Sequence, residues 1–137
     1  MSIDPVTAIH MSAALLATAI GPIALWARRA GASRPRLHRG AGYAWVTLMV
    51  LTALSALFIR HSPLALLAGF SLVHLLIPLT LGMLVLAFRF LFQGNVTGHR
   101  KTMRNLYLGA CVVAGLFTLS PHRLLGQLVW GQWLGLV

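Results

Sequence analysis

The chain has 137 residues, of which 58% are hydrophobic and only 9% are charged, and its mean hydropathy is +0.84. A soluble domain of this size needs a polar surface that so few charged residues cannot supply, so the composition indicates an integral membrane protein. The single acidic side chain, Asp4, excludes a carboxylate dyad or a zinc-protease site, and the sequence contains no glycine-rich phosphate loop.

Four apolar runs qualify as helices that cross the ~30 Å hydrocarbon core of a bilayer. They cover residues 6–27, 41–59, 64–92 and 105–119. Because the bilayer offers no hydrogen-bond partners to an open backbone, each run is expected to be helical. The sequence therefore predicts an all-α membrane protein, a single transmembrane domain over residues 1–137 folded as an up-down-up-down bundle of four transmembrane helices.

The basic residues are concentrated in two of the three connections between these runs. Arg28, Arg29, Arg34, Arg36 and Arg39 belong to the first connection, Arg89, Arg100, Lys101 and Arg104 to the third, and Arg60 and Arg123 to the opposite side. The positive-inside rule then predicts a multi-pass protein of the bacterial inner membrane with both termini on the periplasmic side. Topology thus accounts for the net charge of +10, with the lipid bilayer rather than nucleic acid as the partner.

The two halves of the chain, roughly residues 6–59 and 64–119, resemble one helical hairpin written twice. Each half has a histidine in its first helix and a His-Arg pair at the start of its second helix, namely His10 and His38, then His74 and His99. In an up-down-up-down bundle, the first and third helices are diagonal partners, as are the second and fourth. We therefore expect His10 to face His74 near the outer surface and His38 to face His99 near the inner surface.

Two facing histidines inside a membrane bundle can hold the iron of a b-type haem, and the sequence offers two such pairs. Ionisable residues within a membrane usually face the interior and mark a functional site, and neutral imidazole binds iron well. Arg39, Arg100 and Arg104 would neutralise the haem propionates beside the inner pair. Another metal is less expected, because no carboxylate or thiolate lies at ligand spacing from the histidines.

Small residues on the stripe of His10, namely Ala14, Ala17 and Gly21, would leave room for such a macrocycle. The alternative is that these histidines are structural, either hydrogen-bonded to a neighbouring helix or, for His38 and His99, placed among lipid headgroups. His61 and His122 fall in the predicted outer connections, where solvated surface is expected.

A family resemblance rests on the histidine motifs. HRGAGY at 38–43, HRKTMRNLY at 99–107 and LSPHRLLG at 119–126 resemble segments of a family of small bacterial four-helix membrane proteins of unknown function. More distantly, four histidines in two diagonal pairs resemble the transmembrane di-haem cytochromes b, which pass electrons to quinone, ferric iron or ascorbate radical. That likeness implies quinone as a partner.

The tail, residues 121–137, begins with Pro121 and carries Trp130 and Trp133, which predicts a C-terminal helix lying in the outer interface. Two hypotheses for the function follow from these features. In the first, the protein is a membrane cytochrome b that carries electrons across the bilayer. In the second, it is a non-catalytic accessory or structural subunit of a larger membrane complex.

Overall fold

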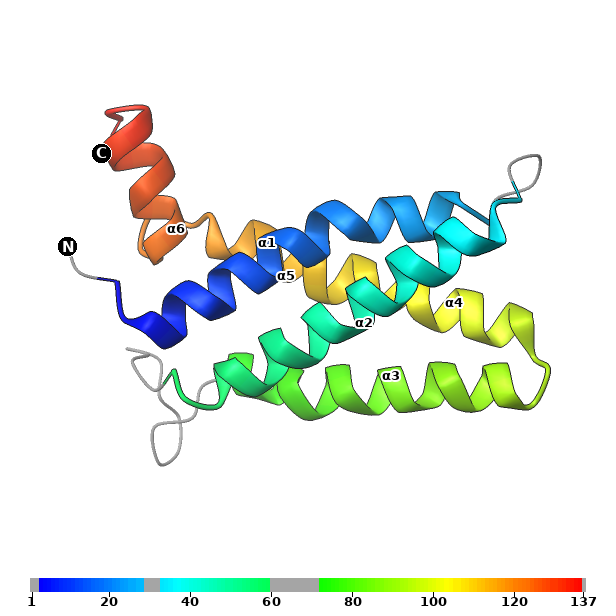
Figure 1. Ribbon diagram of the computed structural model, residues 1–137. Helices are drawn as coiled ribbons and strands as arrows, with labels where there is room; N and C mark the ends of the chain where they lie inside the picture. Colours follow the sequence, from blue (N-terminus) through cyan, green and yellow to red (C-terminus); the bar gives the residue numbers. More distant parts are fainter. Residues whose placement is uncertain (1–2, 29–32, 60–71, 137) are drawn as a thin grey trace.

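The computed structural model describes residues 3–28, 33–59 and 72–136. Within these ranges all regular structure is helical and there is no β-strand, which confirms the all-α class. Helices α1 (Pro5–Trp26) and α2 (Pro35–Ala56) form a first hairpin, and α3 (Leu76–Phe92) and α4 (Val96–Leu106) form a second one (Figure 1). The end of α1, the start of α2 and the turn between α3 and α4 lie at one end of the molecule, while the start of α1 and α6 lie toward the other end.

The fourth helix continues well beyond α4. The backbone passes from α4 into a π-helical segment, η2 (Tyr107–Val113), and then into α5 (Ala114–Thr118) without a break. After a turn, α6 (Leu124–Gly126) and the π-helical η3 (Gln127–Trp133) form one short helix near the C-terminus, in the region where an interfacial helix is predicted.

Among the residues that the structure describes, α1 is the one helix that is both long and apolar enough to cross a membrane, while α3 is apolar but has 17 residues. Residues 64–71 of the third predicted span lie outside the described ranges. The helices α2 and α4 begin six and nine residues earlier than the apolar runs 41–59 and 105–119. Hydropathy misses these first turns because their residues are basic and polar, although Pro35 favours the first turn of α2.

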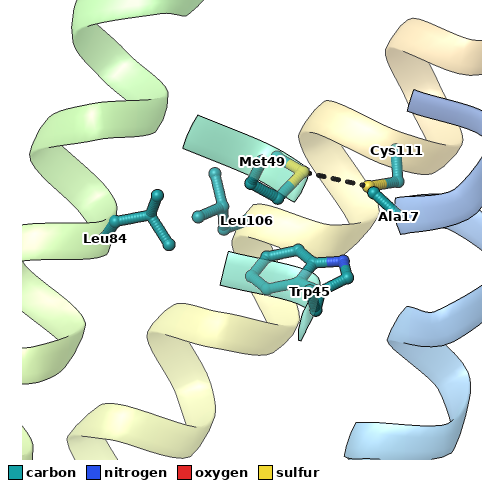
Figure 2. Packing of buried hydrophobic residues seen from close by; sticks show 6 residues of the cluster. All are labelled: Ala17, Trp45, Met49, Leu84, Leu106 and Cys111. Carbon is teal, nitrogen blue, oxygen red and sulfur yellow. Dashed lines mark hydrogen bonds between the residues drawn. The ribbon is translucent and has the colours of Figure 1, made fainter. Parts of the chain in front are cut away.

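Four helices enclose a core at the middle of the molecule. The helix α1 packs on α2, α2 on α3, α3 on α4, and η2 packs back on α1. We call the buried residues that meet at this point the central cluster: Ala17, Trp45, Met49, Leu84, Leu106 and Cys111 (Figure 2). The Cys111 thiol contacts the sulfur of Met49 at 3.7 Å, and the rings of Trp45 and Tyr107 lie 6.5 Å apart. Side chains from all four helices therefore close the centre of the bundle.

Asn95 initiates the fourth helix, and its loss should weaken the second hairpin. Gly94 has a φ of 74°, and the Asn95 side-chain oxygen accepts a hydrogen bond of 2.8 Å from the Gly98 N–H as an N-cap. We expect Asn95→Ala to cost about 1 kcal/mol, seen as a lower midpoint of thermal unfolding in detergent. Asn105→Ala is the control, because Asn105 is an exposed residue near the end of α4. Equal losses from both substitutions would contradict the capping role.

Candidate histidine sites at the two ends of the bundle

Three of the four helical histidines stand two helical turns from a residue of the central cluster. His10 precedes Ala17, His38 precedes Trp45, and His99 precedes Leu106, in each case by seven residues on one helix stripe. All three rings are half-buried. The three histidines therefore lie on the stripes that their helices turn toward the interior, with His38 and His99 near the hairpin turns and His10 near the other end.

The imidazole of His10 is bound to α2. Its Nδ1 lies 2.9 Å from the Thr52 carbonyl oxygen and 3.1 Å from the Ser55 hydroxyl. Because a carbonyl oxygen can only accept a hydrogen bond, Nδ1 carries the ring proton and donates a hydrogen bond to the Thr52 carbonyl. In a neutral ring with this tautomer, Nε2 keeps its lone pair, which makes it the nitrogen able to ligate a metal.

His38 and His99 make equivalent hydrogen bonds in the two hairpins. His38 donates from Nδ1 to the Ala24 carbonyl of α1 at 2.9 Å, and His99 donates from Nδ1 to the Ala87 carbonyl of α3 at 2.9 Å. Each histidine is the fourth residue of its helix, and both alanines are buried. A small alanine side chain lets the imidazole approach the backbone of the partner helix closely. We call these bonds and that of His10 the histidine tethers.

His74 has a different setting from the other three. It lies in the 3-10 segment η1 (Leu72–Leu75), just before α3, and not inside a long α-helix as the run 64–92 predicts. Pro78 has no N–H to donate to the His74 carbonyl, so one α-helical hydrogen bond is missing where η1 meets α3. The ring is half-buried and its Nε2 is shielded from solvent.

The arginines predicted to bind propionates are exposed and carry no internal counter-charge. Arg39 and Arg100 directly follow His38 and His99 near the starts of α2 and α4, and Arg104 lies one turn after Arg100. The single acidic side chain of the sequence, Asp4, caps α1 at the opposite end. Apart from Asp4, an acidic partner for these guanidinium groups would have to come from outside the chain.

The space predicted beside Gly21 for a macrocycle is filled by the chain itself. The Tyr107 ring packs against Gly21, and its hydroxyl donates to the Thr18 carbonyl at 3.0 Å. Two grooves, of about 340 Å³ between α1 and α2 and about 550 Å³ between α2 and α3, have no histidine in their walls. Neither these grooves nor the space beside Gly21 is therefore a histidine-lined cavity.

The described residues, 3–28, 33–59 and 72–136, do not form a structural-zinc type of site. No three His, Cys, Asp or Glu side chains of these ranges gather as a metal site. His122 is exposed at the turn before α6, and His61 lies outside the described residues.

Sequence reasoning did not predict that Ala24 and Ala87 accept hydrogen bonds from His38 and His99. The available signal in the sequence was a small alanine at a similar position in each half, since Ala24 lies 14 residues after His10 and Ala87 lies 13 residues after His74.

A comparison with protein-family models assigns this chain to a family. The model of a family described as "Predicted membrane protein (DUF2306)" matches residues 7–133. The chain belongs to the DUF2306 family. No curated protein and no solved structure matches it. Membership of DUF2306 confirms the resemblance to a membrane protein family and supports a bilayer environment, while none of these comparisons reports a cytochrome b.

Proposed function

We propose that this DUF2306 protein is a small b-type cytochrome that carries electrons across the bilayer. His38 and His99 would hold one haem, and His10 and His74 a second one. The observation that supports this most is the set of histidine tethers. Histidines that ligate metals almost always donate their other ring N–H to a carbonyl or carboxylate, which fixes the tautomer and the ring. His10, His38 and His99 meet this requirement.

The proposal includes a four-span topology. All four helices would cross the membrane, with both hairpin turns in the cytoplasm and both termini in the periplasm. Two observations support this arrangement: the helix ends that flank both basic connections lie at the same end of the molecule, and most of the basic residues belong to these two connections. Arg39, Arg100 and Arg104 would then bind the propionates of the inner haem through charge-assisted hydrogen bonds.

In this role the chain binds, orients and insulates, and the cofactor supplies the redox chemistry. A haem held by these histidines would supply one-electron redox chemistry. The tethers hold each imidazole in one orientation. The central cluster, with the rings of Trp45 and Tyr107, keeps water out of the region between the two ends. A quinone dissolved in the bilayer is the proposed partner for electron exchange.

An absorption spectrum of the purified protein tests this function. After expression with ample haem supply, we expect the reduced spectrum of a b-type cytochrome, with about two haems per chain in a haem assay, because the sequence offers two histidine pairs. The fold is checked on the same sample by circular dichroism. A helical, monodisperse and colourless protein would contradict the proposal.

A second function, an accessory subunit of a larger membrane complex, is favoured by the C-terminal tail. Trp133 is 83% exposed, and Leu134 and Leu136 beside it are also largely exposed. The Trp130 indole N–H donates a hydrogen bond of 2.8 Å to the Leu119 carbonyl, which joins the C-terminal helix to the end of α5. The exposed apolar residues after Trp130 would then form a surface for a partner protein. A colourless protein that co-purifies with a stoichiometric partner after solubilisation in mild detergent would support this function instead.

A further inference from the structure

A groove between α2 and α3 opens toward the end of the molecule that carries the hairpin turns. The two helices lie close together where α2 ends and diverge toward the end of α3 (Figure 1). The groove has a volume of about 550 Å³, within the range of ~300–1,000 Å³ typical of small-ligand sites. Val46 and Val50 of α2 and Val85 and Phe88 of α3 provide apolar walls.

Two polar side chains line this groove at the C-terminal end of α3. Arg89 and Gln93 line it one helical turn apart, Arg89 in the last turn of α3 and Gln93 at its C-cap, and both are exposed. Within the part of the chain that the structure describes, no carboxylate pairs with Arg89, since Asp4 caps α1 at the other end. A ligand that matches this lining would be apolar along its length and would carry a negative charge at one end.

We propose that the groove binds an anionic phospholipid, with one acyl chain along Val46, Val50 and Val85 and its phosphate on Arg89 and Gln93. Basic pockets between membrane helices on the cytoplasmic side are typical sites for anionic headgroups. Charge complementarity distinguishes this occupant from a helix of a partner protein, which would need an acidic residue at the same depth. The site rests on the proposed topology, which places the hairpin turns in the cytoplasm, but it involves none of the histidines and so does not depend on haem binding.

Native mass spectrometry of the full chain tests this site. The protein is released from micelles that contain equal amounts of phosphatidylglycerol and phosphatidylcholine with identical acyl chains. We expect wild-type protein to retain phosphatidylglycerol in preference by about fivefold, as an exposed charge pair allows, and Arg89→Gln to abolish the preference. Val85→Trp, which fills the groove at a side chain that is 70% exposed, should remove the retained lipid.

Arg36→Gln is the matched control, because Arg36 is an exposed arginine in the first turn of α2 and does not line the groove. It should leave the preference unchanged. Equal losses from Arg89→Gln and Arg36→Gln would overturn the proposal in favour of unspecific attraction to the basic end. Full retention of lipid by Val85→Trp would also overturn it. So would a wild-type spectrum in which a partner protein, and no lipid, is bound and is lost in Val85→Trp. Circular dichroism confirms that each variant is folded.

Discussion

Gly21→Ala is expected to destabilise the protein by about 1–3 kcal/mol or more and to lower its unfolding temperature clearly. Gly21 is buried in α1 and lies against Tyr107 of the fourth helix. A β-carbon at this position would overlap the Tyr107 ring and would lie 3.1 Å from the Trp45 indole nitrogen. The Tyr107 ring cannot move away easily, because its hydroxyl is bound to the Thr18 carbonyl one turn earlier in α1.

Gly82→Ala provides the matched control for this prediction. Gly82 lies inside α3, is exposed, and would carry a β-carbon with no atom within 4 Å. Alanine there should raise stability by up to ~1 kcal/mol, because glycine weakens a helix interior. The measurement is the thermal unfolding of both variants in the same detergent, followed by circular dichroism. Equal behaviour of the two variants would contradict the close contact at Gly21.

A double-mutant cycle identifies the contact partner. In a Tyr107→Ala background the ring is absent, so Gly21→Ala should lose most of its cost, and the difference is the coupling energy between the two positions. If Gly21→Ala costs the same in both backgrounds, the strain comes from Trp45 instead of Tyr107.

Gly21 also shows where sequence reasoning succeeds and where it fails. The stripe of Ala14, Ala17 and Gly21 correctly marks a face of α1 on which another group approaches closely, because small side chains leave the helix surface low. The sequence does not say which group that is. The interpretation as room for a macrocycle is wrong at Gly21 itself, since the Tyr107 ring of the fourth helix fills the space. Which group occupies the space beside Gly21 depends on long-range packing between helices and not on a local sequence pattern.

The helices themselves were predictable because their signals are local. Long apolar runs predict helices, and Pro35 and Asn95 are typical residues at a helix start. The histidine tethers were not predictable, since the Ala24 and Ala87 carbonyls offer no side-chain pattern, and each bond depends on how closely two helices of a hairpin pack. That opposite histidines share one iron stays a prediction.

The tethers make it possible to separate a structural histidine from a ligand. Asparagine carries its amide nitrogen at nearly the same distance from the backbone as Nδ1 of histidine, so it can donate to the same carbonyl, but it has nothing in place of Nε2. Leucine removes both functions. We expect His38→Asn combined with His99→Asn to remove one of two haems, and thus about half of the reduced absorbance, with little change in unfolding temperature.

The leucine pair, His38→Leu with His99→Leu, should lose the same absorbance and also both tethers. An interhelical hydrogen bond in a membrane protein contributes about 0.6 kcal/mol, so a loss near 1 kcal/mol is expected for the two. Haem content and thermal unfolding are measured on the same samples, with His122→Asn as the control because His122 is exposed at the tail turn. If the asparagine pair keeps its full absorbance, His38 and His99 only join helices, and the inner haem site does not exist.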